Sequence, residues 1–182
     1  NQSEVGSNDS GRFSVYWSQA TPGQTESEAM TEENLADVTP GISGLPYNSW
    51  FTCPVQTAKT CVLDPYFDKV NGKDVLMATI AIPLEENGKV IGVMGMDFSL
   101  ASIQELSLNA HRDLYSGEGH ISIISPAGLL AGHSQDDTQL GQKLDSAFPG
   151  HASELLQMAQ RGESAELVHD DLLEVMEPFL PI

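Results

Sequence analysis

Basic residues are scarce in this chain of 182 residues: 8 lysines and arginines stand against 26 aspartates and glutamates, and the formal net charge is −18. A field of that sign repels nucleic acids and anionic membrane surfaces, so we expect no nucleic-acid partner. The same field attracts cations such as amines and divalent metals. Because an acidic surface also keeps a domain soluble, the charge alone leaves both interpretations open.

Long apolar runs and catalytic motifs are missing as well. No stretch of 18 apolar residues occurs, so no transmembrane helix is predicted. The five histidines are scattered, with no HExxH motif, nucleophile elbow or Gly-rich phosphate loop, and we therefore expect neither an enzyme nor a cofactor. The acidic pairs Asp136-Asp137 and Asp170-Asp171 lack the EF-hand pattern, which favours solvated turns over a metal site.

Only two cysteines are present, Cys53 and Cys61, eight residues apart around Pro54. That spacing can close a small disulfide loop, and a disulfide would indicate an oxidising compartment. Two free thiols are the alternative, whereas a cysteine pair without a nearby histidine makes a poor zinc site.

The pattern of apolar residues and turns predicts an α+β fold with antiparallel sheets, repeated in two modules. Strands are expected over 12–18, 60–66, 74–84, 90–97, 120–125, 129–133, 163–169 and 172–179, and helices over 26–38, 100–110 and 152–161. Residues 47–51 form either one helical turn or a loop over a pocket. The polar segment 111–119 separates a first module, 1–112, from a second, 113–182. The second module is expected to be incomplete because its last strand pattern stops midway, which favours a piece of a larger protein.

Aromatic residues and single carboxylates recur at the junctions of the segment 47–100. Asp97 ends an apolar strand face, where a buried carboxylate needs a partner and Gly95 leaves room for one. Asp97 caps the next helix in the alternative interpretation, but Ser99 can fill that role. The aromatic side chains are either walls of a binding site or ordinary core.

The segment CVLDPYFDKVNGKDVLMATIAIPLEENGKVIGVMGMDFSLASIQEL resembles the membrane-distal module of a double Cache domain, and HISIISPAGLLAGHS resembles the start of its membrane-proximal module. Such domains are periplasmic sensor regions of bacterial methyl-accepting chemotaxis proteins and of some histidine kinases. The resemblance implies two PAS-like modules and a long N-terminal helix, which nothing in this chain matches. It also implies a parent receptor in the inner membrane that works as a homodimer.

In the amino-acid-binding members of that family, an Arg-x-Trp-Tyr segment, a later Tyr and a terminal Asp hold the ligand. By the resemblance, Trp50 and Phe51 match the Trp-Tyr pair, Tyr66 the later Tyr and Asp97 the Asp. Asn48 stands where the arginine is expected, and an amide cannot replace the bidentate guanidinium clamp for a carboxylate. The resemblance therefore implies a site that has lost its anion clamp and kept its cation partner.

We accordingly expect a sensor of a small cationic ligand such as a polyamine, histamine or a choline-like amine. The ligand-binding residues predicted are Tyr16, Trp17, Tyr47, Trp50, Phe51, Asp64, Tyr66 and Asp97. The alternative is the same fold sensing an amino acid or organic acid through another basic residue, for which Arg12, Lys59, Lys69 and Lys73 are the candidates. The second module has no comparable set of aromatic residues and is expected to be empty.

Overall fold

The computed structural model describes residues 6–21, 23–70, 72–161, 165–169 and 172–176. Contacts divide the chain into two compact units, Asn1–Asp97 and Phe98–Ile182. Helix α3 (Leu100–Asp113) therefore lies in the second unit, although the sequence pattern had grouped it with the first module. Helices and antiparallel strands in both units confirm the α+β prediction.

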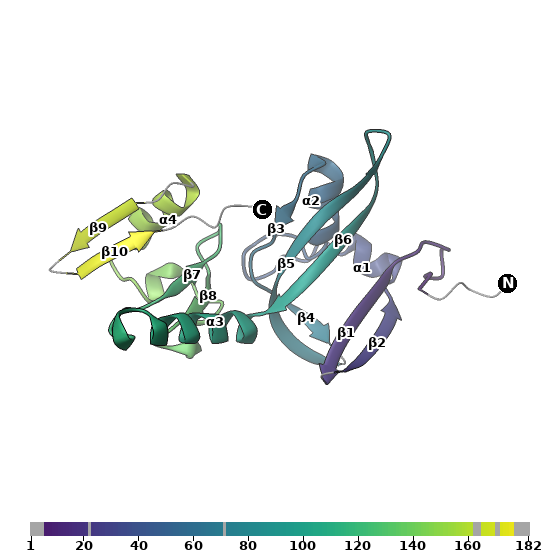
Figure 1. Cartoon of the computed structure of the whole chain (residues 1–182). Helices are drawn as coiled ribbons and strands as arrows, with labels where there is room; N and C mark the ends of the chain where they lie inside the picture. Colours follow the sequence, from purple (N-terminus) through teal and green to yellow (C-terminus); the bar gives the residue numbers. More distant parts are fainter. Residues whose placement is uncertain (1–5, 22, 71, 162–164, 170–171, 177–182) are drawn as a thin grey trace. The chain divides into compact units, whose positions relative to one another are not determined.

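The first unit is built on a four-stranded sheet with β5 (Lys73–Glu86) at its centre. β5 pairs with β3 (Cys61–Val62), β4 (Tyr66–Val70) and β6 (Lys89–Ser99), as its apolar run predicted. Asn87 and Gly88 join β5 to β6, and both adopt positive φ values, as a two-residue hairpin turn requires. The two long strands curve together in Figure 1.

A separate hairpin precedes that sheet and corrects one prediction. β1 (Val15–Thr21) pairs antiparallel with β2 (Gln24–Ala29), so the helix expected over 26–38 is wrong for its first turn. The helix α1 spans only Glu32–Ala36, because Thr31 and Asn34 form a capping box that fixes its start. The strand assigned to 60–66 also divides: Leu63, Asp64 and Pro65 separate β3 from β4.

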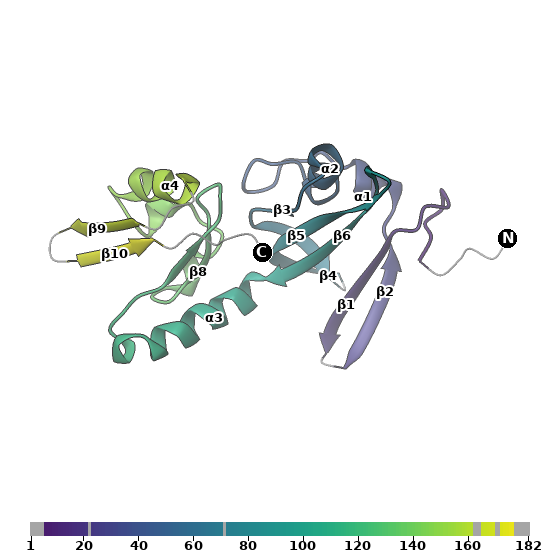
Figure 2. The ribbon, with the colours of Figure 1, turned by 45° about the horizontal axis from the view of Figure 1, so that its top comes forward.

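Helix α2 (Ser49–Thr57) is longer than the single turn expected at this point. Pro54 lies inside it and hid the helix from sequence patterns, because proline usually breaks a helix interior. α2 packs against β5 and β3 (Figures 1 and 2). Cys61, Leu63 and Ala81 form the buried cluster beneath it, with Trp50, Cys53 and Val93 packed around them.

The second unit combines α3, α4 (Ala152–Arg161) and two small antiparallel hairpins. The hairpins are β7 (Ser122–Ile124) with β8 (Leu130–His133), and β9 (Ala165–His169) with β10 (Leu172–Met176). Three short 3₁₀ turns cover Tyr115–Gly117, Asp137–Gln139 and Leu144–Ser146. The core is Leu130, Leu144, Ala152 and Leu155.

Helix α3 lies unusually close to β8. The buried Gln104 side chain donates to the His133 carbonyl and accepts from the His133 amide, both at 2.7 Å, as a neighbouring strand would. A Cβ atom at Gly132 would lie 2.3 Å from the Ser107 Oγ atom. Glycine is therefore required at 132 for this close approach.

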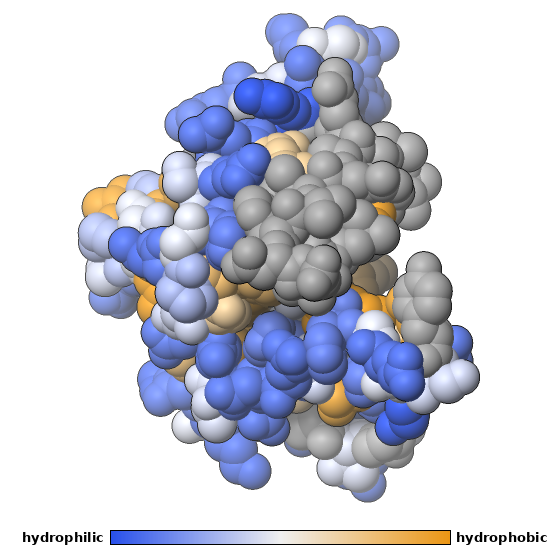
Figure 3. All heavy atoms as spheres, turned by 90° about the vertical axis from the view of Figure 1, so that its left-hand side faces the viewer, coloured by the Kyte–Doolittle hydropathy of each residue, from blue (hydrophilic) through white to orange (hydrophobic). Residues whose placement is uncertain are grey.

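The surface reflects the composition. In the face shown in Figure 3, the described residues are mostly hydrophilic, with small apolar areas between them. No helix in the part of the chain that the structure describes is long and apolar enough to cross a membrane.

Candidate ligand-binding site

A chain of hydrogen bonds links β4, β5 and β6 on one face of the first sheet. Thr79, 2% exposed on β5, donates its hydroxyl to the Asp97 Oδ1 atom at 2.6 Å. The Tyr66 hydroxyl lies 2.7 Å from the Thr79 Oγ1 atom. Tyr66 faces Met77 in the strand register, so Thr79 is its diagonal neighbour on the same face. Ser99 caps α3 and accepts from the Ser102 amide, which leaves Asp97 free of the capping role, as predicted.

The β1–β2 hairpin contributes Tyr16 to the same carboxylate. The side chain of Tyr16 interacts with Asp97, which is 81 residues further along the chain, and each group shifts the pKa of the other. The next residue, Trp17, points the other way along the strand and is 61% exposed. The structure therefore brings Tyr16 to Asp97 and leaves Trp17 at the surface.

A second tyrosine–carboxylate pair lies beside the first. The Tyr47 hydroxyl donates to the Asp68 Oδ1 atom at 2.8 Å. The rings of Tyr47 and Tyr66 meet edge to face, with centroids 6.0 Å apart. The rings of Tyr47 and Tyr66 thus form an aromatic wall that is hydrogen-bonded to Asp68 directly and to Asp97 through Thr79.

A cavity of about 390 Å³ adjoins that wall. The loop 39–46, the start of α2 and residues 63–67 enclose it. Four of the predicted site residues line it: Tyr47, Trp50, Asp64 and Tyr66. Apolar walls and a second carboxylate, Asp37, complete a lining of the mixed kind found in small-molecule sites.

The other four predicted residues do not line the cavity: Tyr16, Trp17, Phe51 and Asp97. The ring of Phe51 lies 5.8 Å from that of Trp50, which does line it. Trp50 itself has two roles, because it lines the cavity and packs on the buried cluster of Cys61, Leu63 and Ala81.

Two of the four basic residues proposed as an alternative clamp, Arg12 and Lys69, are held in ion pairs. Among the described residues, the cavity lining contains no lysine or arginine. Arg12 forms an ion pair with Glu32 at 2.8 Å, and hydrogen bonds from Arg12, Asn8 and Ser10 lower the pKa of Glu32 to about 2. Lys69 pairs with Asp74 at 2.8 Å, at the surface. Arg12 is therefore held at an exposed ion pair, away from the role of a carboxylate clamp.

Asn48 has a structural role in the position where the resemblance implied an arginine. Its buried side-chain Nδ2 atom donates to the Leu35 carbonyl at 2.9 Å and so ties α1 to the start of α2. The amide is used inside the protein and does not line the cavity.

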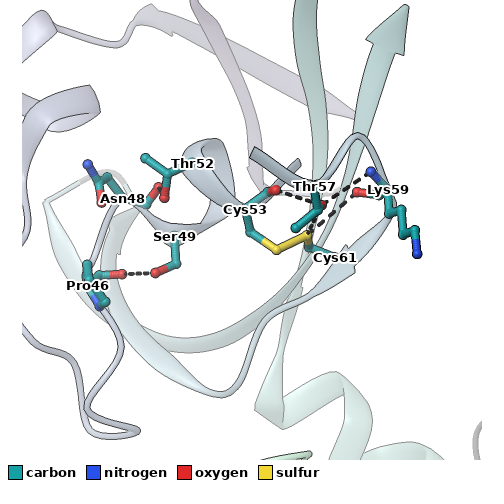
Figure 4. The surroundings of a disulfide bond; sticks show 8 residues. All are labelled: Pro46, Asn48, Ser49, Thr52, Cys53, Thr57, Lys59 and Cys61. Atoms are coloured by element: carbon teal, nitrogen blue, oxygen red, sulfur yellow. Dashed lines mark hydrogen bonds between the residues drawn. A yellow bond between two sulfur atoms is a disulfide. The ribbon is translucent and has the colours of Figure 1, made fainter. Parts of the chain in front are cut away.

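The disulfide predicted between Cys53 and Cys61 is present (Figure 4). It joins α2 to β3, with Cα atoms 6.3 Å apart. Thr57, on the last turn of α2, donates to the Cys53 carbonyl at 2.8 Å beside it. The bond therefore fixes the helix that carries Trp50.

Burial sets the protonation of these groups. Burial raises the pKa of Asp97, and hydrogen bonds from Thr79 and Tyr16 oppose part of that rise. Burial and the neighbouring carboxylates raise the pKa values of Tyr16, Tyr47 and Tyr66 well above the ordinary value of a phenol. The three hydroxyls therefore keep their protons at neutral pH and act as donors.

Sequence reasoning missed Thr79 and Asp68. Thr79 is the one hydroxyl residue in the apolar run VLMATIAI, and a polar residue on a buried strand face needs a partner. That signal was available. Asp68 lies in a segment that looked like a turn, and its contact with Tyr47 depends on the strand β4 that was not predicted.

The comparisons with known proteins agree with this architecture. Residues 5–105, more than half of the chain, match the family described as methyl-accepting chemotaxis protein-like, first PDC sensor domain. The chain therefore belongs to this family and is a sensor domain of the chemoreceptor type, with a PDC or Cache-type fold.

The methyl-accepting chemotaxis protein TlpQ of Pseudomonas aeruginosa is 54% identical over 181 residues, covering 100% of this chain and 25% of the relative. The chain thus spans about a quarter of that protein's length. A structure of methyl-accepting chemotaxis protein X has a TM-score of 0.61 at 22% identity and covers 99% of this chain and 62% of its own. The periplasmic sensory domain of the Campylobacter jejuni chemoreceptor Tlp1 has a TM-score of 0.58 at 16% identity, covering 91% and 55%. These two structures support the fold.

Proposed function

We propose that the first unit binds a small cationic amine and that binding is the input of a chemoreceptor. The observation that carries this proposal is the set of carboxylates around an aromatic wall. Thr79 donates to Asp97, and Tyr47 donates to Asp68. The adjoining cavity is lined by two more carboxylates, Asp37 and Asp64, and by no lysine or arginine among the described residues. A carboxylate in such a place favours a cation and disfavours a ligand carboxylate.

The energies of these contacts are sufficient for sensing. A charge-assisted hydrogen bond contributes about 1.5–3 kcal/mol, and a cation–π contact with an aromatic face about 0.5–2 kcal/mol. Two or three such contacts with some apolar burial reach about 8 kcal/mol, which corresponds to micromolar affinity. Polyamines and histamine can make both kinds of contact, whereas choline-like ions, which have no N–H group, can make only the cation–π contacts.

The role of the whole receptor is part of the same proposal. By the family resemblance, the parent protein is an inner-membrane homodimer that converts ligand binding into a chemotaxis signal. Ligand can shift the signalling equilibrium only as far as it binds one state better than the other. We infer that closure of the cavity around the ligand supplies that difference.

Calorimetric titration of the 182-residue chain, with the full-length receptor in parallel, tests the proposal. The titrants are butane-1,4-diamine, histamine, choline and a panel of amino acids at pH 7. Amines should bind, and Asp97→Asn should weaken them about 10- to 150-fold through loss of a charge-assisted hydrogen bond. Asp74→Asn, a carboxylate on the same strand as Thr79 but in an exposed ion pair, is the matched control and should bind normally. Binding of amino acids alone would contradict the proposal and direct attention to Arg12.

A further inference from the structure

The direction of the hydrogen bonds around Asp97 follows from counting protons. A hydroxyl carries a single proton. Thr79 gives its proton to Asp97, so the short contact between Tyr66 and Thr79 must use the proton of Tyr66. Tyr47 gives its proton to Asp68. The side chain of Tyr16 interacts with the carboxylate of Asp97, which can only accept hydrogen bonds.

The hydroxyl protons of Thr79, Tyr66 and Tyr47 therefore point at protein acceptors. What remains for a ligand is a set of oxygen lone pairs: those of the tyrosine hydroxyls and the unused positions of two carboxylates, each of which offers about four. Among the described residues that bond to these two carboxylates or to each other, Thr79, Tyr66 and Tyr47 have no hydroxyl proton left to donate. A ligand that reaches Asp97 and Asp68 must therefore bring its own donors to them.

Thr79 holds this pattern in place. It is 2% exposed on the central strand, and its hydroxyl accepts from Tyr66 while it donates to Asp97. Without that hydroxyl, Tyr66 would be free to turn its proton to the ligand, and Asp97 would lose the contact that fixes its orientation.

We propose that Thr79 is a positioning residue that makes the site selective for ammonium ligands with N–H groups and against quaternary ammonium ions. The inference rests on the proposed function, because it names which amines the Asp97 site takes. Each N–H that is replaced by a methyl group removes one donor, while the positive charge stays the same. The site then has a buried acceptor without a partner, which is the condition that gives strong discrimination.

Two matched ligand series test this selectivity on the 182-residue chain by calorimetry. The probes are butane-1,4-diamine and 2-phenylethylamine, each compared with its N-methyl and N,N,N-trimethyl derivatives. We expect the trimethyl derivative to bind about 10- to 150-fold more weakly than the better-bound parent amine, with the methyl derivative between them. Quaternary ions that bind as tightly as the primary amines would overturn the inference while leaving the amine proposal intact. Absence of any amine binding would overturn both.

Variants separate donor matching from steric exclusion. Thr79→Val keeps the size of the side chain. It should reduce the ratio of the affinity for the primary amine to the affinity for the quaternary ion about tenfold, and Thr79→Ser should restore that ratio. Thr138→Val is the matched control, because Thr138 donates to Asp136 at the same 2.6 Å but in the second unit. An unchanged ratio in Thr79→Val would mean that size alone rejects the methyl groups, and the inference would be wrong.

A second readout needs no ligand. Carbon-13 NMR of the Asp97 carboxyl, assigned with Asp97→Asn, should show a higher pKa in Thr79→Val than in the wild type and recovery in Thr79→Ser. If Thr79→Val acted only by disturbing the packing, Thr79→Ser would not be expected to keep both the Asp97 pKa and the affinity ratio at their wild-type values. No change of the Asp97 pKa in Thr79→Val would show that the hydroxyl does not donate to Asp97.

Discussion

Reduction of the Cys53–Cys61 disulfide should destabilise the first unit and loosen the helix that carries Trp50. The bond closes a loop with a sequence separation of only 8, for which the loss of chain entropy in the unfolded state gives about 2.5 kcal/mol. For a chain of this size, that corresponds to a fall of roughly 1–2.5 M in the urea midpoint. The loss should be local at first, because α2 is tied to β3 by this bond.

Urea unfolding followed by tryptophan fluorescence measures this loss with and without reductant. Trp50 packs on the buried cluster, whereas Trp17 is exposed, so the change in emission should come mainly from Trp50. The variant Cys53→Ala/Cys61→Ala is the control and should not respond to reductant. A loss below about 0.5 kcal/mol on reduction would refute the reasoning, since it would mean that the unfolded chain is not constrained by the bond.

Three further outcomes are expected. Gly132→Ala should cost about 1–3 kcal/mol in chemical denaturation because its Cβ meets Ser107, and Ser107→Ala should recover part of that loss in the double variant; strictly additive effects would contradict the contact. Burial lowers the pKa of His133, so the unfolded chain binds more protons than the folded one, and the free energy of unfolding should fall as pH drops below about 6.5. The same dependence of the free energy of unfolding on pH in His133→Gln would argue against this. Burial raises the pKa of Asp97, so the folded state loses stability as pH rises through that pKa and the carboxylate becomes charged. The melting temperature of Asp97→Asn should therefore be higher than that of the wild type at pH 7, and the difference should disappear below about pH 4. A lower melting temperature of Asp97→Asn at pH 7 would contradict this.

Local signals predicted much of the fold. The helix 152–161 and the long hairpin around Asn87-Gly88 follow from apolar periodicity and turn chemistry, and the structure confirms both. The errors fall where local preferences conflict with tertiary structure. Pro54 concealed α2, and acidic residues with weak periodicity concealed β2, which pairs with β1 and is exposed along its whole length.

The site could be predicted only in part, for a physical reason. Alternation along a strand says that Tyr16 and Trp17 face opposite ways, but it does not say which one faces the sheet. The pairing of Tyr16 with Asp97 depends on how a separate hairpin packs on that sheet, which no local pattern encodes. Asn48 is a different case: the sequence marked it as the position where the expected arginine is missing, and the structure gives its amide a buried bond to the Leu35 carbonyl that no local pattern predicts.

A crystal structure of the 182-residue chain soaked with the best-binding amine tests the central claim most directly. The account predicts an ammonium nitrogen about 2.7–2.9 Å from a carboxylate oxygen of Asp97, the length of a charge-assisted hydrogen bond. An aromatic ring of Tyr16, Tyr47 or Tyr66 should lie within about 6 Å of the charge. An amine bound in the second unit, or a ligand carboxylate paired with Arg12, would contradict the account.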